Sequence, residues 1–454
     1  MKDFETDYAH WAMSWDAIDP ESSPLGSASF SKDKGARLFT PGQRLLHLSF
    51  NGVEVVADPP TDLFGIANDK KYYVLLNGIP GKTDPAGQEV ISDTLLIGAN
   101  RFDYNAPVSE IEFELKGLEN WAKGFGVPSL RDLSKSIEEK PTHELELYSD
   151  DEKSIVLKSG YIVSPKPSGS AQFDRICEIV IHFQDHVSFN QALDDAYSIL
   201  LLVSFCTGWY ASFTKICITN ALDESYCVLG RFKDDESHSF NVYESPISFE
   251  EFLGRSADLI AAWIGCSEHL KTAIYEYVPL ATERQLIYGD LRIIAVSQVF
   301  EALGRASNAV AEVNPEQEQK KKRLKAEAKQ LPESELRKWA LKKLKEKKRV
   351  TYKDGVRKVL SDIGPFVDVV IPDKEKFIDL QVELRNDFVH RNPIISSHEN
   401  EYLLYHTHVA MMLCQASIMR FIGFSESEIF DALDGYKRDI RRRFASFYSV
   451  ADGG

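Results

Sequence analysis

The sequence lacks the features that place a chain in or across a membrane. A spanning helix needs about 20 consecutive apolar residues, and the longest candidate run, 196–205, is too short and follows acidic residues. The first seven residues, Met1–Asp7, do not combine a basic segment with an apolar core, so we predict no secretory signal. We therefore expect a cytoplasmic protein that does not bind membranes.

Metal-binding patterns are also missing. The six cysteines are scattered and form no CxxC pair, whereas zinc sites need clustered ligands. His182 and His186 are four residues apart, but they follow a strand-like run and would point apart or lie past its end. Three further histidines cluster near a predicted helix start without a carboxylate at ligand spacing, and we interpret them as ordinary helix residues: His398, His406 and His408. We predict reduced thiols, no metal and no cofactor.

Positive charge is scarce overall, because the 454 residues carry a net charge of −16. Alone, this argues against a general nucleic-acid binder, since phosphate contacts need Lys and Arg. However, residues 320–349 contain 14 basic and 4 acidic residues, a net charge of +10, which leaves −26 for the remainder. An acidic body with one basic segment suggests divided roles. The pattern leaves open whether this segment binds RNA or an acidic surface of another subunit.

The N-terminal part of the chain is predicted to be β-rich. Short apolar runs alternate with turn signals, including Asn-Gly at 51–52 and 77–78, where we expect hairpins. Gly78–Thr83 ends like a phosphate-binding loop, but Leu76 replaces the required glycine and Asp84-Pro85 does not continue as a helix, so we interpret it as a turn. Residues 1–187 should form a sandwich- or barrel-like region, completed in residues 188–247 by a helix capped by Ser188 and further strands.

From residue 248 onward the periodicity is helical. Ser248–Glu251 matches a capping box before a long amphipathic run to about Tyr277, and another helix is predicted over 288–306. The basic insert, 316–349, predicts either a solvated helix pair broken at Pro332 or a partly disordered segment. Four more helical stretches follow. The fold class is therefore α+β, with a β-rich N-terminal region followed by an all-α bundle over 248–454.

One motif in the helical region carries chemistry. Arg385 and His390 are separated by four residues near the end of a predicted helix, and Asn386 directly follows the arginine. Cleavage of RNA by its own 2′-OH needs a base, an acid and positive charge near the phosphorane oxygens. Histidine can serve as acid or base near neutral pH, and arginine offers a charged fork to phosphate. Such a site needs no metal. The structural alternative is a helix C-terminus at which Arg and His cap carbonyls.

This pattern resembles the R-x4-6-H motif of HEPN ribonucleases, in which Asn commonly follows the Arg. The resemblance implies an endoribonuclease with Arg385, His390 and Asn386 as catalytic residues. Asp387 and Glu301 are supporting candidates, the latter as a functional carboxylate or as an ion-pair partner of Arg385. Positions five apart on a helix differ by about 140° of rotation, so either the helix frays near His390 or a second subunit completes the cleft. The resemblance implies at least a homodimer.

The N-terminal region has a resemblance of its own. Its strands and turns, with the run from Gly78 to Leu96 and the run Ile111–Trp121, resemble the N-terminal domain of ApeA-like anti-phage defence proteins, which combine such a region with a C-terminal HEPN nuclease. This implies that the N-terminal part senses infection through a phage-derived trigger. The nuclease would cleave host RNA, with tRNA as the expected target, in abortive infection. Phosphate contacts would come from basic residues that we list here: Lys320, Lys321, Lys322, Arg323 and Arg391.

Two other functions compete with this one. The helical region could be a non-catalytic HEPN module that binds nucleotide or protein and mediates assembly, since fold does not determine function. Alternatively, the β-rich region could recognise a ligand while the helices serve only for oligomerisation. Loss of RNA cleavage in a His390→Ala variant would favour the nuclease over both.

Overall fold

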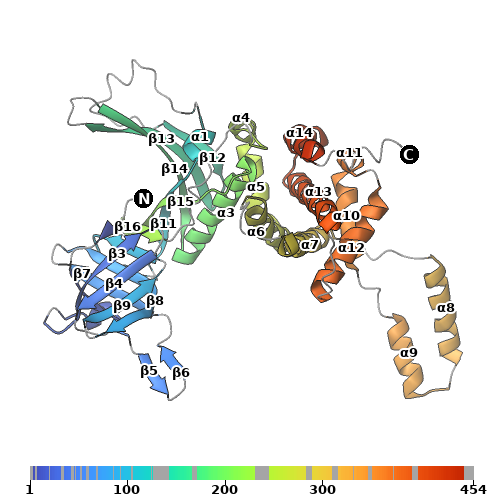
Figure 1. The fold of residues 1–454 in the computed structure, drawn as a ribbon, viewed down its shortest axis with the longest axis horizontal. Helices are drawn as coiled ribbons and strands as arrows, with labels where there is room; N and C mark the ends of the chain where they lie inside the picture. Colours follow the sequence, from blue (N-terminus) through green and yellow to red (C-terminus); the bar gives the residue numbers. More distant parts are fainter. Residues whose placement is uncertain are drawn as a thin grey trace. The chain divides into compact units, whose positions relative to one another are not determined.

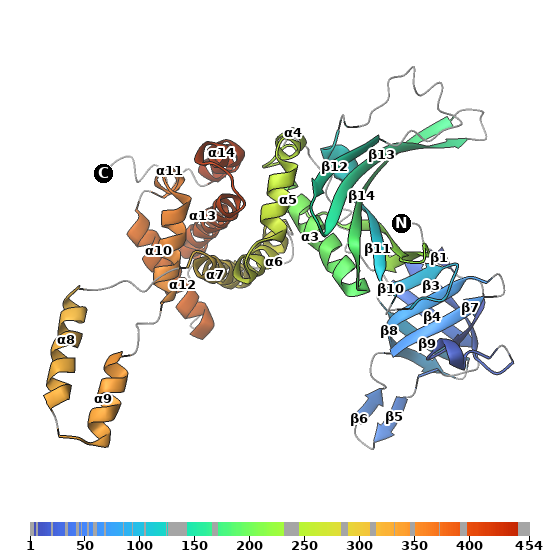
Figure 2. The same ribbon diagram turned by 180° about the vertical axis from the view of Figure 1, so that it is seen from behind.

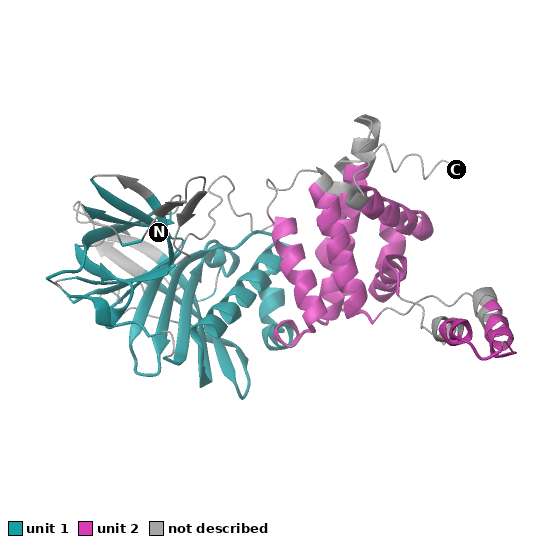
Figure 3. Cartoon of the chain, turned by 90° about the horizontal axis from the view of Figure 1, so that it is seen from below, with its two compact units in different colours: residues 1–261 teal, residues 262–454 magenta. Residues whose placement is uncertain are grey.

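The computed structural model describes most of the chain. The described residues are 4–5, 8–19, 21–31, 35–41, 45–46, 48–51, 54–57, 61–67, 70–84, 86–92, 94–103, 106–123, 125, 143–165, 171–230, 245–282, 289–308, 315–330, 332–345, 350–371, 373–390 and 397–443. The chain packs as two compact units, residues 1–261 and 262–454 (Figure 3). The first is β-rich and the second is helical, as the α+β prediction required.

The first unit contains a closed six-stranded barrel. Neighbouring strands pair antiparallel in the order β8 (Tyr72–Asp84), β7 (Thr61–Ala67), β2 (Ala9–Ala12), β3 (Leu25–Ser31), β4 (Gly35–Pro41) and β9 (Gly87–Ser92), and β9 pairs with β8 again (Figure 1). Alternating side chains point inward and form a buried core that includes Trp11, Phe30, Leu38 and Leu75. Closure leaves few free strand edges, which limits unwanted strand pairing.

Two smaller pairings accompany the barrel. The short β1 (Phe4–Glu5) pairs with β3, next to the barrel wall, and η1 (Trp15–Ala17) is a single 3-10 turn after β2. The hairpin predicted around Asn51-Gly52 is confirmed, because β5 (Leu48–Asn51) pairs with β6 (Glu54–Ala57).

The hairpin predicted at Asn77-Gly78 is wrong, because both residues lie inside β8. Asn77 adopts a left-handed φ of 51°, and β8 has one extra residue opposite β7, which is a β-bulge. The Asp62 side chain accepts a hydrogen bond from the Asn77 N–H at 2.7 Å. The bulge bends β8, so its first half pairs with β7 and β10 (Thr94–Gly98) while its second half pairs with β9. The Asn-Gly signal thus marks a change of partner in a continuous strand.

An open antiparallel sheet continues from the barrel through β10. Its order is β10, β16 (Ser225–Gly230), β15 (Phe213–Asn220), β11 (Val108–Leu115), β14 (Ala171–Val187), β13 (Lys153–Pro165) and β12 (His143–Ser149). The helix α3 (Phe189–Thr207) packs against β11 and β14 (Figures 1 and 2). Ser188 caps α3 by accepting from the Gln191 N–H, as predicted. The sheet face under this helix is apolar, and the opposite face carries Glu112, Glu178 and Lys215.

The long helix expected from 248 to about 277 is divided into three helices. They are α4 (Phe249–Leu253), α5 (Ser256–Ile264) and α6 (Glu268–Thr282). The Ser248–Glu251 capping box is present. The rings of Phe249 and Phe252 contact Trp121 of α1 (Leu118–Trp121) at 5.3 and 5.1 Å between centroids. Residues 248–261 therefore pack with the β-rich unit, although their helical pattern suggested the helical region.

The helical unit is built around α7 (Gly289–Ala306). This helix contacts α6, α10 (Tyr352–Ile363), α12 (Lys374–His390) and α13 (Ser397–Phe421). The short α11 (Phe366–Val370) packs against α14 (Glu426–Arg443), which also contacts α13. The basic insert forms the helix pair α8 (Pro315–Gln330) and α9 (Glu335–Lys345). Within the described ranges, no helix is both long and apolar enough to cross a membrane.

Candidate active site

Arg385 is positioned by helix α12. The helix begins after Asp373, whose side chain accepts a hydrogen bond from the Lys376 N–H at 3.0 Å in the manner of an N-terminal cap. Leu384 is buried against Ile293 and Leu403, so α12 turns an apolar side toward α7 and α13. Arg385 lies at the border of this buried side, and its side chain is 33% exposed. The guanidinium is therefore held by the bundle and still reachable from solvent.

Two groups from different helices hold the Arg385 guanidinium. Its Nη2 donates to Oε2 of Glu301 on α7 at 2.9 Å. Its central carbon lies 4.8 Å from the ring centroid of Tyr352, the first residue of α10. The ion pair and the cation–π contact each favour one placement of the charge. Of the two roles predicted for Glu301, the ion pair with Arg385 is present, and a role as a functional carboxylate stays a prediction.

Glu301 is itself flanked by charges. Its Oε1 accepts from Arg305, one turn further along α7, at 2.6 Å. On α6, Glu276 has a buried Oε2 without a hydrogen-bond partner. Burial, with a smaller contribution from the negative charge of Glu301, raises the pKa of Glu276. The site therefore combines two arginines with two glutamates.

A buried polar network lies beneath Arg385. Gln381, one turn before Arg385 on α12, is 1% exposed. Its amide nitrogen donates to Ser297 Oγ and to Tyr352 Oη, both at 3.0 Å. Its carbonyl oxygen lies 2.7 Å from His406 Nε2. All polar groups of the Gln381 side chain are thus engaged, and the network fixes the hydroxyl end of the ring that supports Arg385.

The chemical state of His406 follows from this contact. An amide carbonyl only accepts, so Nε2 of His406 must carry the hydrogen. Burial lowers the pKa of His406 to about 3, and its ring packs against Phe377 in a tilted arrangement with centroids 4.5 Å apart. His406 is therefore a neutral hydrogen-bond donor at neutral pH. It supports the site and is not suited to proton transfer.

A close approach of two helix backbones brings the supporting residues together. An added Cβ at Gly304 of α7 would lie 2.8 Å from the Cα of Gly355 in α10. Only glycine allows this distance, because any Cβ would collide with backbone. Glu301 lies three residues before Gly304, and Tyr352 lies three residues before Gly355. The glycine contact thus brings the helices that carry the carboxylate and the aromatic ring close enough for both to reach the guanidinium.

The remaining motif residues have the following positions. Asn386 and Asp387 are exposed on α12. His390 is the last residue of α12, and its side chain lies outside the described residues. Arg391 lies outside the described residues. The predicted pairing of His390 with Arg385 in one site stays a prediction.

Sequence reasoning missed Tyr352, Gln381, Gly304, Gly355 and Glu276. The spacing of four between Gln381 and Arg385 was a usable signal, because such residues share a helix face. The sequence predicts an ordinary helix residue at His406, whereas the structure gives it a specific supporting contact. Among the residues the structure describes, no three His, Cys, Asp or Glu side chains form a group suited to a metal ion.

The basic insert is a pair of helices with exposed cations and exposed apolar side chains. Lys320, Lys322 and Arg323 are exposed on α8, and the side chain of Lys321 lies outside the described part. Leu336 and Trp339 on α9 are 67% and 59% exposed. The pair is inserted between α7, which carries Glu301, and α10, which carries Tyr352.

Comparison with known families gave two matches. Residues 27–251 match the ApeA N-terminal domain 1, and residues 294–428 match the Apea-like HEPN domain. The first match covers the strands of the open sheet and most of the barrel, without β2, and the second covers the helices that hold Glu301, Tyr352 and Arg385. Comparison with curated proteins and with solved structures found no match.

Proposed function

Because the chain belongs to the ApeA-like HEPN proteins, we propose that it is a metal-independent endoribonuclease in which Arg385 and His390 act on the RNA phosphate. The observation that carries this proposal is the placement of Arg385. Its charge is held by Glu301 and Tyr352 and remains one-third exposed, five residues before His390 on the same helix. A preorganised cation at a solvent-accessible position suits the stabilisation of a developing negative charge.

The proposed reaction uses the 2′-OH of RNA as its nucleophile. The 2′ oxygen attacks the adjacent phosphorus, a base removes its proton, and the 5′ oxygen leaves with a proton from an acid. Arg385 would stabilise the phosphorane oxygens, and His390 would serve as acid or base. Asn386 would bind the backbone or orient the histidine, and Asp387 is a weaker candidate for the same role. The products are a 2′,3′-cyclic phosphate and a 5′-hydroxyl.

The helix geometry supports a composite site formed by two copies. Arg385 and His390 differ by about 140° around a helix axis, and α12 continues to His390. One straight helix therefore does not turn both side chains to the same spot. In our proposal, α12 of a second copy lies across the first, and the RNA phosphate binds between them.

We assign RNA binding to the pair α8–α9. Exposed lysines and arginines can neutralise phosphates, and an exposed tryptophan among them can stack on an unpaired base. Arg391, outside the described residues, would add a phosphate contact beside the catalytic helix. Their target is proposed to be host RNA, with tRNA as the preferred class, in the cytoplasm.

RNA binding by α8–α9 can be tested without cleavage. In a His390→Ala background, the triple change of Lys320, Lys322 and Arg323 to Ala should lower the salt dependence of RNA binding by about two to three units of slope. Trp339→Ala should weaken binding by a factor that does not depend on salt. Lys271→Ala, which removes an exposed lysine from α6, is the matched control. An unchanged salt slope in the triple variant would remove the assignment.

The two-unit organisation supports a proposal for the cellular role. We propose that the barrel and open sheet detect a phage-derived trigger and that the helical unit then cleaves host RNA, which stops growth of the infected cell. A repressed ground state would protect the host until the trigger arrives. This role predicts that cleavage increases when extract from phage-infected cells is added.

The proposal is tested by metal-free RNA cleavage. Wild type, Arg385→Ala and His390→Ala are incubated with total bacterial RNA in EDTA, with and without extract from infected cells, and product ends are mapped. We expect cyclic-phosphate ends with wild type and none with either variant. His143→Ala, an exposed histidine on β12, controls for nonspecific loss. Equal cleavage by wild type and His390→Ala would exclude the proposed mechanism.

One observation favours a second function, a non-catalytic HEPN module that binds nucleotide or protein. The charge of Arg385 is compensated by Glu301 within the chain itself. Replacing Glu301 by Gln separates the two functions. A nuclease variant would still form cleavage product, at the same or a different rate. A binding module would show changed RNA or nucleotide affinity and no product in any condition.

A further inference from the structure

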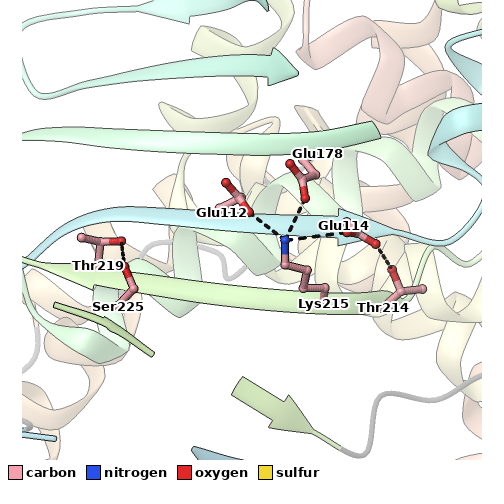
Figure 4. A network of polar contacts seen from close by, with 7 residues as sticks. All are labelled: Glu112, Glu114, Glu178, Thr214, Lys215, Thr219 and Ser225. Atoms are coloured by element: carbon pink, nitrogen blue, oxygen red, sulfur yellow. Dashed lines mark hydrogen bonds and ion pairs between the residues drawn. The ribbon is translucent and has the colours of Figure 1, made fainter. Parts of the chain in front are cut away.

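Two cysteines face each other on neighbouring strands of the open sheet. Cys217 on β15 is directly opposite Cys227 on β16. Directly opposed residues of antiparallel strands have Cα atoms about 4.5–5.5 Å apart, which lies within the range that disulfides accept. Side chains do meet on this ladder, since the next pair on the same face, Thr219 and Ser225, is joined at 3.0 Å between hydroxyl oxygens (Figure 4).

The two thiols already interact and are partly exposed. Each thiol changes the pKa of the other, and both residues are half-buried. Two residues before Cys217 on the same strand, Lys215 binds Glu112 and Glu178 at 2.9 and 2.8 Å (Figure 4). A third carboxylate, Glu114, lies 3.8 Å from the Lys215 ammonium. The pair therefore lies in a polar row of the sheet, beside a lysine held by three glutamates.

This environment makes the two sulfurs unequal. A hydrogen bond from the Cys217 thiol, assisted by the charge of Lys215, lowers the pKa of Cys227 to about 7. The same hydrogen bond raises the pKa of Cys217. The thiolate is the reactive form of cysteine, so Cys227 is suited to attack and Cys217 to resolve the product. The other four cysteines lack this combination, because three are buried and the partly exposed Cys266 has a pKa raised by burial.

We propose that Cys217 and Cys227 form a redox-active dithiol that a hydroperoxide oxidises to an intramolecular disulfide. The Cys227 thiolate attacks a peroxide oxygen, the O–O bond breaks, and the departing oxygen takes up a proton as water or alcohol. Cys227 is then a sulfenic acid. The Cys217 sulfur attacks it, an S–S bond forms, and the sulfenic oxygen leaves with the Cys217 proton as water. Two thiols and one peroxide thus give one disulfide, one water and one water or alcohol.

The position of the pair indicates what the disulfide would link. β16 lies between β15 of the open sheet and β10, which pairs with the barrel strand β8. Cys227 also packs, with Ile97, against the barrel core. The disulfide would join β15 covalently to β16, the neighbour of the strand β10 that connects the open sheet to the barrel. This proposal does not depend on the nuclease activity proposed above.

The experiment oxidises the reduced full-length protein with stoichiometric hydrogen peroxide and maps its cysteines by alkylation and mass spectrometry. We expect loss of two of the six thiols and a single linked pair of peptides, containing Cys217 and Cys227. From its thiolate fraction and lower intrinsic nucleophilicity, Cys227 should react at least about five-fold faster than Cys266 at neutral pH. Six free thiols after treatment, or a disulfide with another partner, would overturn the proposal.

Two variants assign the roles of the sulfurs. Cys217→Ser should stop at the sulfenic acid on Cys227, which dimedone traps. Cys227→Ser should lose the fast reaction, and its remaining thiols should react at the rate of Cys266. Trapping on Cys217 instead, or equally fast oxidation of the Cys227→Ser variant, would contradict the mechanism. The wild-type mapping decides the disulfide itself even if a variant folds poorly.

Discussion

Replacing Gln381 by Leu removes the centre of the network beneath Arg385 while nearly preserving side-chain volume. The variant loses hydrogen bonds to Ser297, Tyr352 and His406. The largest cost comes from the buried His406 N–H, which is left without an acceptor, because an unsatisfied buried polar group costs about 1–3 kcal/mol. At about 2 kcal/mol, the opening equilibrium of the helical unit should rise roughly 30-fold.

Hydrogen–deuterium exchange of the full-length protein measures this change locally. Peptides from α12 and α13 should exchange roughly 30-fold faster in the variant, and peptides from the barrel strands, such as β3 and β4, should be unaffected. The double variant with His406→Phe removes both partners of one hydrogen bond. It should be less destabilised than the sum of the single variants by about 1 kcal/mol. Unchanged exchange of α12 in Gln381→Leu, or strict additivity, would refute the network as a stabilising unit.

Three further predictions follow from the helical unit. The pKa of His406 is about 3 in the folded chain and about 6.5 when unfolded, so the unfolded state binds more protons between these pH values. The free energy of unfolding should therefore fall by about 2 kcal/mol from pH 7 to pH 5, and His406→Phe should flatten this pH dependence in urea titrations. Gly304→Ala should destabilise the unit by about 1–2 kcal/mol through overpacking against Gly355, whereas Gly435→Ala, whose Cβ meets nothing within 4 Å, should stabilise it by up to about 1 kcal/mol in the same thermal scans. Tyr352→Phe keeps the ring under Arg385 and should retain most RNA cleavage. Tyr352→Leu should lose about 0.5–2 kcal/mol of cation–π stabilisation, which corresponds to a roughly 2- to 30-fold lower cleavage rate. Equal cleavage rates for the two variants would contradict a role for the ring.

Local signals predicted much of the secondary structure. The Ser188 and Ser248 caps and the break at Pro332 in the basic insert were all visible in short stretches of sequence. The failures share one cause. Asn77-Gly78 is a sequence typical of turns, but here it lies inside one strand. The first half of that strand pairs with β7 and β10, and the second half pairs with β9. Likewise, residues 248–261 have a helical pattern, but the rings of Phe249 and Phe252 pack against Trp121 in the β-rich unit.

The candidate site divides in the same way. Arg385, Asn386 and His390 could be proposed from sequence because their spacing lies within one helical segment. Glu301 was a weaker candidate, because the sequence indicated only that its helix should pack beside the helix of Arg385. The ion pair between the two residues joins positions 84 apart in the sequence. Tyr352 and His406 gave no local signal, since a tyrosine at a helix start and a histidine in an apolar helix are ordinary. Their roles depend on Gln381, which contacts both.

The sequence by itself determined the order of β-rich and helical regions, the helix caps, the basic insert and the motif on α12, because these depend on residues within a few positions of each other. Only the tertiary structure decided how the barrel closes, which carboxylate and which ring hold Arg385, and which two of six cysteines meet. Those outcomes depend on backbones that approach from distant parts of the chain, as Gly304 and Gly355 do. Contacts of that kind are set by packing of whole elements, which no short stretch of sequence encodes.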